Sequence, residues 1–201
     1  MQEPTLVPRP DQSPASSQVL FVCRANYCRS PMMEHLFRAA QADGQIISGD
    51  NPPWVATSAG IYSRGDLPAH PHTIRVLEER GIHATQWRSR VLTPLVVASA
   101  DLILTAEPAQ RRYVVEMVPG AVGRTFSLLS FVRWLQAVQH LPTERAGPAH
   151  LQLISRAAAG RALVQPLTER EQNVPDPLGH SLRRFRSCRG VIESAVAALA
   201  A

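Results

Sequence analysis

The segment that most constrains the fold of this chain runs from residue 18 to residue 35, QVLFVCRANYCRSPMMEH. Residues 19–22 are all apolar, and most have β-branched or aromatic side chains, which predicts a buried strand that stops at Cys23. After a short loop, the apolar residues recur at helical spacing, so we expect Ser30 to be the N-cap and Pro31 the first helical residue. Cys23 is thus expected at the carboxyl end of a strand, with the following loop leading back to a helix N-terminus.

This arrangement predicts a site for an anion. A tight loop that leads into a helix directs several unpaired backbone N–H groups and the positive end of the helix dipole at one point. A thiol placed there ionises readily. Arg29, six residues after Cys23, offers a planar guanidinium that can hold two phosphate oxygens. We therefore expect Cys23 to be a nucleophile that accepts a phosphoryl group, and Arg29 to bind the phosphate.

The same residues resemble the signature of the low-molecular-weight protein tyrosine phosphatase family, Cys-x-Gly-Asn-x-Cys-Arg-Ser-Pro after a strand. Residues 23–31 read CRANYCRSP here, so Ala25 stands where the family has Gly. The resemblance implies that Ser30 donates its hydroxyl to the Cys23 sulfur, and Asn26 is a residue that tolerates left-handed backbone geometry. The residues expected to bind the phosphate are Arg24, Ala25, Asn26, Tyr27, Cys28 and Ser30.

Cys28 has two readings. The resemblance implies that it forms a reversible disulfide with Cys23, which would shield the nucleophile from over-oxidation. The alternative is that Cys28 is a small buried side chain in a crowded loop.

Two further segments resemble the family. Ser58 begins a Ser-Ala-Gly sequence after the strand expected at residues 54–57, and the resemblance implies that it braces Asn26. Asp176 stands between two prolines that keep it out of a helix. The resemblance implies that Asp176 is the general acid, and then the base that activates water against a cysteinyl phosphate. Asp101 and Glu107 are rival carboxylates, and both fit structural roles better.

The order of strands and helices predicts an α/β fold with three layers. Strands are expected at residues 19–22, 54–57, 100–105 and 124–126, separated or followed by helices at 30–43, 73–80, 111–118, 128–140 and 181–200. Such alternation indicates a four-stranded parallel sheet flanked by helices on both faces, with the phosphate-binding loop after the first strand. Ligands in these sheets bind beyond the carboxyl ends of the strands.

Length and composition suit one globular domain. We expect residues 1–17 to be a disordered leader and residues 18–201 to be a single domain. Residues 141–172, with several prolines and glycines around a helix at 149–159, form an expected helical insertion whose function the sequence does not reveal.

Composition excludes several classes of protein. Three cysteines make neither a disulfide framework nor a zinc pattern, so we expect a reducing, cytoplasmic location, with no metal and no cofactor. Cys188 is expected in the core. No apolar run is long enough for a membrane span. The net charge of +5 comes from scattered arginines, which does not indicate a nucleic-acid surface. One cluster is expected to be a solvated helix face, or else a site for an acidic partner: Arg183, Arg184, Arg186 and Arg189.

The expected function is cysteine-dependent hydrolysis of phosphomonoesters, with a phosphotyrosine protein or another phosphomonoester as substrate. Trp87 stands where the family has His, and Leu178 where phosphotyrosine enzymes tend to have an aromatic residue. Together with Ala25, these departures favour one alternative, a non-catalytic phospho-binding or regulatory module. The other alternative is a thiol-dependent arsenate reductase, which shares the fold and the loop.

Overall fold

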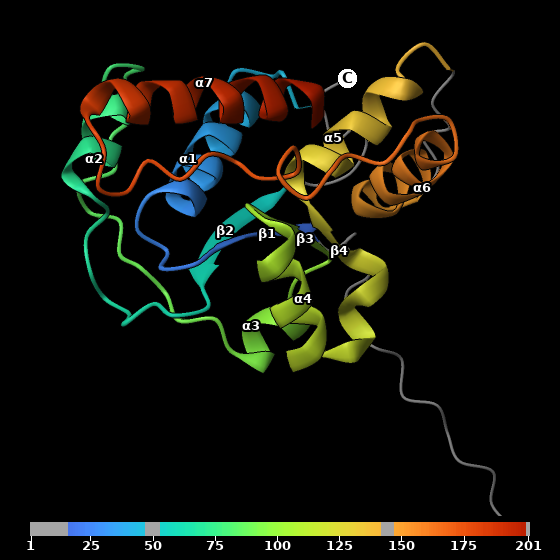
Figure 1. Ribbon diagram of the computed structural model, residues 1–201, viewed down its shortest axis with the longest axis horizontal. Coiled ribbons are helices and arrows are strands. Elements are labelled where there is room, and N and C mark those ends of the chain that lie inside the picture. The colour runs from blue at the N-terminus through green and yellow to red at the C-terminus, as the bar shows by residue number, and fades with distance from the viewer. Residues whose placement is uncertain (1–15, 47–52, 142–146, 200–201) are drawn as a thin grey trace, which may run out of the picture.

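The computed structural model describes residues 16–46, 53–141 and 147–199. Four strands form one parallel sheet in the order β2-β1-β3-β4, and helices cover both of its faces (Figure 1). This confirms the predicted three-layer α/β fold. The elements are β1 (Gln18–Cys23), α1 (Arg29–Ala42), β2 (Val55–Gly60), α2 (Pro71–Glu78), α3 (Pro94–Ala98), β3 (Leu102–Thr105), α4 (Pro108–Met117), the 3₁₀ helix η1 (Pro119–Arg124), β4 (Thr125–Ser127), α5 (Leu128–Ala137), α6 (Ala149–Arg161) and α7 (Leu182–Leu199).

The central strand β1 is buried on both faces, as a near-continuous apolar run should be. Successive side chains of a strand point to opposite faces. Val19 and Phe21 therefore pack in the core formed with α1, α5 and α7, whereas Leu20 and Val22 pack in the core formed with α3, α4 and η1. Cys188 lies in the first of these cores with 1% of its surface exposed, which confirms its predicted core position.

Prolines mark the starts of several helices. Pro71, Pro94 and Pro108 each occupy the first position of a helix, where the missing N–H costs nothing and the fixed φ angle suits the helix. Apolar spacing alone placed α2 and α4 two and three residues too late, and it did not predict α3 or η1. The strands were each found where apolar runs predicted them, with ends that differ by up to three residues.

Helix α6 lies in the segment expected to be an insertion, and it packs directly against α5. Gly160 permits this close approach, because a Cβ at that position would lie 1.8 Å from the carbonyl oxygen of Trp134. Residues 142–146 of the expected insertion and residues 1–15 of the expected leader lie outside the described residues. Ser17, placed in the leader by the sequence analysis, is buried, and its carbonyl accepts a hydrogen bond from the Val55 N–H at 2.9 Å.

Candidate active site

The loop between β1 and α1 occupies residues 24–28, at the carboxyl end of the central strand. Helix α1 begins at Arg29, so Ser30 lies in its first turn and is not the N-cap that the sequence predicts. The Ser30 hydroxyl instead lies 2.9 Å from the Cys23 sulfur. The helix therefore starts closer to the cysteine than predicted, and a hydroxyl of its first turn contacts the thiol.

The carbonyl groups of this loop point outward to the segment that follows β2. They accept backbone N–H bonds in three pairs: Cys23 from Ile61 at 3.2 Å, Arg24 from Tyr62 at 2.8 Å and Tyr27 from His70 at 2.9 Å. Among the described residues, no protein acceptor pairs with the backbone N–H groups of residues 25–28. A loop with engaged carbonyls and free amides is suited to hold an anion.

Asn26 links the loop to the end of β2. Its backbone has φ 51°, the left-handed geometry expected for this residue. Its side-chain amide donates to the hydroxyls of Ser30 at 2.8 Å and Ser58 at 2.9 Å, and its oxygen accepts the Arg90 N–H at 2.6 Å. The structure therefore brings Ser58 to Asn26 and fixes the loop from three directions.

Glu34 extends this network, and sequence reasoning missed it. Its carboxylate, almost fully buried, accepts hydrogen bonds from Ser58 Oγ at 2.6 Å and from Trp87 Nε1 at 3.1 Å, and pairs with Arg38 at 2.8 Å. Trp87 thus supplies a ring N–H donor at the position where the family has His. One feature of the sequence could have indicated Glu34: it is an acidic residue among the apolar residues of a predicted helix, one turn after Ser30.

Gly60, the last residue of β2, is a second residue that the sequence analysis did not assign to the site. A Cβ there would lie 2.5 Å from the backbone nitrogen of Asn26. Real Cβ atoms are essentially never that close to a non-bonded heavy atom. The close approach of the loop to β2 therefore requires glycine at position 60.

Arg29 is 3% exposed and lies between two carboxylates. Its Nη1 donates to Glu107 and to the carbonyl of Val174 at 3.2 Å, and its Nη2 donates to Asp176 Oδ2 at 2.8 Å. Burial lowers the pKa of Arg29, but the neighbouring Cys23, Glu107 and Asp176 raise it above its ordinary value overall. The guanidinium therefore remains a cation.

The two other carboxylates singled out in the sequence have different positions. Glu107 follows β3 and contacts Arg29, so it belongs to the site as a residue that orients the guanidinium. Asp101 instead accepts the backbone N–H of Gln18 at 2.7 Å, at the start of β1. The chain folds so that Asp176, although 147 positions after Arg29, lies beside it.

Several side chains lie around the loop. Arg24 is exposed and its guanidinium carbon lies 5.6 Å from the ring centroid of Tyr62, which is 62% exposed. Tyr27 packs edge-on against His70, with ring centroids 5.1 Å apart. Leu178 is exposed two residues after Asp176. Tyr62 is therefore an exposed aromatic ring next to the loop.

The other two cysteines are buried thiols near the site. Burial, with smaller contributions from Cys23 and Asp176, raises the pKa of Cys28 to about 12. Burial likewise raises the pKa of Cys188 to about 12, against an opposing effect of Arg29. Both therefore stay protonated at neutral pH. All three cysteines are free in this structure.

The described part of the chain has no group of three or more His, Cys, Asp or Glu side chains arranged to hold a metal ion. It also has no helix of sufficient length and hydrophobicity to cross a membrane.

The chain is similar in sequence to several known enzymes. A family model described as low molecular weight phosphotyrosine protein phosphatase matches residues 18–143. A probable low molecular weight protein-tyrosine-phosphatase, EpsP of Ralstonia solanacearum, is 36% identical over 110 residues, which are 55% of this chain and 69% of that protein. A protein-arginine-phosphatase of Geobacillus stearothermophilus is 33% identical over 115 residues, 57% of this chain and 71% of that protein. Arsenate reductase 1 of Staphylococcus epidermidis is 31% identical over 87 residues, 43% of this chain and 57% of that protein.

Solved structures show the same architecture. A low molecular weight protein tyrosine phosphatase from T. tengcongensis has a TM-score of 0.66 and 26% identity, and the alignment covers 92% of this chain and 97% of that one. The arginine phosphatase YwlE from Geobacillus stearothermophilus has a TM-score of 0.65 and 25% identity, with 92% and 90% covered.

Proposed function

Because the chain belongs to the low molecular weight phosphotyrosine protein phosphatase family, we propose that it hydrolyses phosphotyrosine in proteins through a cysteinyl-phosphate intermediate. The observation that carries this proposal is the arrangement of Cys23, Arg29 and Asp176 around a loop whose amides are free. It combines a nucleophile, an anion-binding cradle and an acid in one place.

The loop would bind the three non-bridging oxygens of the phosphate. The amides of residues 24–28 and the Arg29 guanidinium donate to these oxygens, and the thiolate of Cys23 faces the phosphorus. Ser30 donates to the sulfur and so stabilises the thiolate as nucleophile and as leaving group. Asn26, Ser58 and Glu34 hold the loop in this geometry through the hydrogen bonds described above.

The reaction has two steps. The Cys23 sulfur attacks phosphorus, the S–P bond forms, the bond to the tyrosyl oxygen breaks, and Asp176 gives that oxygen a proton. Asp176 then takes a proton from water as the water oxygen attacks phosphorus, and the S–P bond breaks to release inorganic phosphate and the thiolate. Asp176 and a bound phosphate compete for the Arg29 Nη2, so substrate binding would free the carboxyl group for proton transfer.

The substrate, the partner surface and the location are also proposals. Tyr62 offers an exposed ring for a tyrosyl side chain, and Arg24 favours acidic residues near it. An acidic partner at the start of α7 would meet Arg183 and Arg184, because Arg186 and Arg189 already pair with Glu79. Three free thiols fit a reducing cytoplasm.

Arsenate reduction is the second candidate. Relatives named arsenate reductases match this chain, and the thiols of Cys28 and Cys188 lie near enough to Cys23 to interact with its charge. A non-catalytic phosphate-binding module is the third candidate. The experiment described next distinguishes the three candidates.

The test measures phosphate release from a phosphotyrosine peptide and from a small aryl phosphate by the wild type, Cys23→Ser and Asp176→Ala. We expect no turnover by Cys23→Ser and a fall of about two to four decades for Asp176→Ala. A phosphoarginine peptide is the comparison substrate, because a protein-arginine-phosphatase is among the relatives. Equal rates in all three proteins would reject the enzyme, and turnover of arsenate alone with a thiol donor would select the reductase.

A further inference from the structure

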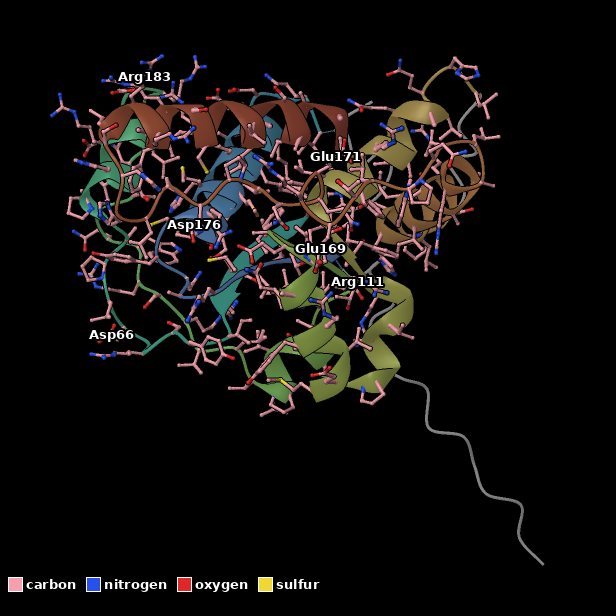
Figure 2. The ribbon with its side chains drawn as sticks, viewed as in Figure 1. Asp66, Arg111, Glu169, Glu171, Asp176 and Arg183 are labelled. Atoms are coloured by element: carbon pink, nitrogen blue, oxygen red, sulfur yellow. The ribbon has the colours of Figure 1, made fainter. Side chains whose placement is uncertain are left out.

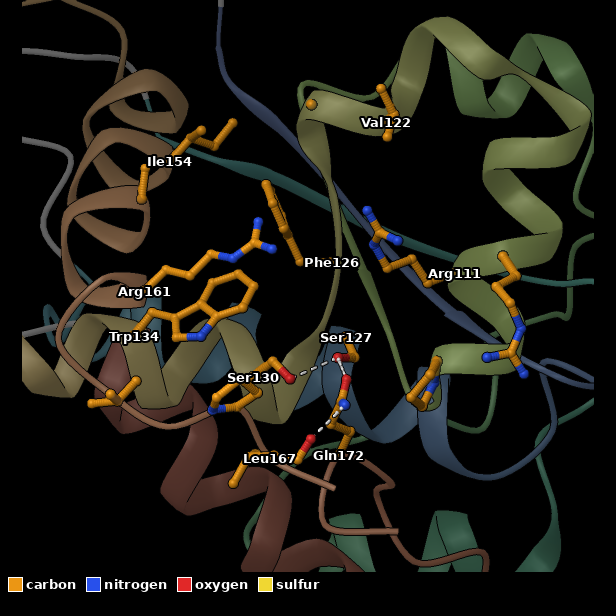
Figure 3. Close-up of a pocket in the computed structure, with 16 residues that line it drawn as sticks. Arg111, Val122, Phe126, Ser127, Ser130, Trp134, Ile154, Arg161, Leu167 and Gln172 are labelled. Atoms are coloured by element: carbon orange, nitrogen blue, oxygen red, sulfur yellow. Dashed lines mark hydrogen bonds between the residues drawn. The ribbon is translucent and has the colours of Figure 1, made fainter. Parts of the chain in front are cut away.

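A cavity lies beside β4, at the edge of the sheet (Figure 3). Its volume is about 890 Å³, large enough for a small organic ligand. Its walls come from α4, η1, β4, α5, α6 and the segment that follows α6. None of the described lining residues belongs to the loop from Cys23 to Ser30. One wall is formed by lining residues between Ile154 and Gln172, all of which follow residue 143, where the family match ends. Membership of the family therefore does not imply this cavity.

Two arginines enter the cavity without an acidic partner. Figure 3 shows Arg111 from α4 and Arg161 from the end of α6 directed into the cavity from opposite sides. Arg111 Nε donates to the carbonyl of Thr125 at 2.8 Å, which fixes the side chain, and its terminal nitrogens have no hydrogen-bond partner in the described part of the chain. No carboxylate of the described residues lies within ion-pair distance of either guanidinium, whereas Arg112, also in the lining, pairs with Glu169 at 3.0 Å.

Among the residues that the structure describes, no acidic side chain pairs with either of these two arginines. Burial, and then the neighbouring Arg161, lower the pKa of Arg111 from its ordinary value. Both causes disfavour the cation, and a bound anion would relieve them. Positive charge of this kind in a partly buried cavity is typical of a place where an anionic group binds.

Apart from the polar residues Arg112, Ser127, Ser130 and Gln172, the rest of the lining is apolar and aromatic. Trp134 packs under Arg161, whose guanidinium carbon lies 5.4 Å from the ring centroid, and Phe126 packs edge-on against Trp134 with centroids 5.9 Å apart. Ile154, Val164 and Leu167 complete the apolar part. Such a surface suits a flat apolar body, and the two arginines suit an acidic group attached to it.

We propose that this cavity is a binding site for a small organic anion that carries an apolar ring, with the acidic group held between Arg111 and Arg161 and the ring against Phe126 and Trp134. None of the residues described as lining this cavity belongs to the phosphatase site, and the proposal does not depend on the reaction proposed there.

The test uses naphthalene-1-sulfonate as probe and the indole N–H signals of ¹⁵N-labelled protein as readout. The chain has three tryptophans, and a Trp134→Phe variant assigns the signal from the cavity. Trp87 lies in the hydrogen-bond network behind the phosphate-binding loop and therefore reports on that site. We expect the Trp134 signal to shift and saturate. Naphthalene-1-methanol, which lacks the charge, and inorganic sulfate, which lacks the ring, should each bind at least about tenfold more weakly.

The variants Arg111→Met and Arg161→Met should each weaken the probe about tenfold, since each removes a charge-assisted hydrogen bond. Arg161 is the safer variant for folding, because it is exposed and contributes no hydrogen bond to the protein among the described residues. Arg183→Met removes the same charge from α7, far from Arg111 (Figure 2), and should bind as the wild type does. The inference is overturned if only Trp87 shifts, if the uncharged naphthalene or sulfate binds as tightly as the probe, or if Arg183→Met weakens binding as much as Arg161→Met.

Discussion

Arg29 Nη2 lies 2.8 Å from Asp176 Oδ2, so the guanidinium proposed to bind phosphate also holds the carboxylate proposed to protonate the leaving group. The two residues are far apart in the chain, and the segment from Val174 to Asp176 is tied to Arg29 through both a backbone carbonyl and a side chain. In the proposed mechanism, a bound phosphate replaces Asp176 on Arg29, so the binding of substrate frees the Asp176 carboxyl group for proton transfer.

Asp176→Asn keeps the size of the side chain and removes the acid. We expect kcat/KM on phenyl phosphate, which reports the phosphorylation of Cys23 and not the later hydrolysis of the intermediate, to fall about two to four decades. The fall on p-nitrophenyl phosphate should be smaller, because nitrophenolate leaves without needing a proton. Asp66→Asn is a matched control, since Asp66 is exposed and has φ 52°, a geometry that Asn also tolerates. Equal losses on the two substrates would count against a general-acid role.

Glu107→Gln tests whether Glu107 orients Arg29. The loss of the ion pair should lower kcat/KM about tenfold, mainly through a higher KM, because a less fixed guanidinium binds the phosphate less well. Glu107→Asp, which keeps the carboxylate on a side chain one methylene shorter, should retain most of the activity. Glu116→Gln, an exposed substitution on the same helix, should have no effect. A role in orientation is refuted if Gln and Asp behave alike.

Ser58→Ala tests the network behind the loop. It removes the acceptor for Asn26 and the donor to Glu34, and leaves a buried carboxylate with one fewer partner. We expect the free energy of unfolding to fall by about 1–3 kcal/mol, measured by urea denaturation. Ser187→Ala, at an exposed position on α7, should change it by less than about 0.5 kcal/mol. Similar values for the two variants would mean that the network contributes little to stability.

His35 should make stability depend on pH. Burial lowers the pKa of His35 below its ordinary value of 6.5, with Glu34 opposing and Arg38 supporting the shift, and its buried Nε2 has no hydrogen-bond partner among the described residues. The unfolded chain therefore binds a proton more readily than the folded protein. Stability should fall as the pH drops from 6.5 towards the lower pKa of the folded state.

His35→Gln should flatten this pH dependence, measured as urea midpoints between about pH 7.5 and pH 5, the range over which His titrates. Part of the slope should remain, because burial, and then His72, also lower the pKa of His70. His83→Gln, at an exposed position, is the control and should keep the wild-type slope. A slope in His35→Gln as steep as in the wild type would show that this residue is not responsible.

The sequence predicted the sheet and the phosphate-binding loop because both depend on local signals. An apolar run followed by Cys, Asn, Arg and Ser indicates a strand, a tight loop and a helix start within a few residues. The same signals misplaced the start of α1, because the helix begins at Arg29 and Ser30 bonds to the Cys23 sulfur instead of capping the helix.

Contacts between distant segments could not be predicted in the same way. Glu34 appears in the sequence only as a charge on an apolar helix face, and its partners Ser58 and Trp87 come from two other segments. Glu107 was assigned a structural role, and the structure shows that this role is exerted on Arg29. The cavity at Arg111 and Arg161 depends on the packing of α6 against α5, which Gly160 permits and which no local pattern indicates.

The central claim is that Cys23 carries the phosphoryl group during turnover. Acid quenching during hydrolysis of phenyl phosphate, followed by intact-mass spectrometry, tests it directly. We expect one added phosphoryl group on the wild type and on Cys28→Ala, and none on Cys23→Ala. A phosphoryl adduct that persists in Cys23→Ala, or its absence from wild-type enzyme quenched at saturating substrate while hydrolysis proceeds, would contradict the account.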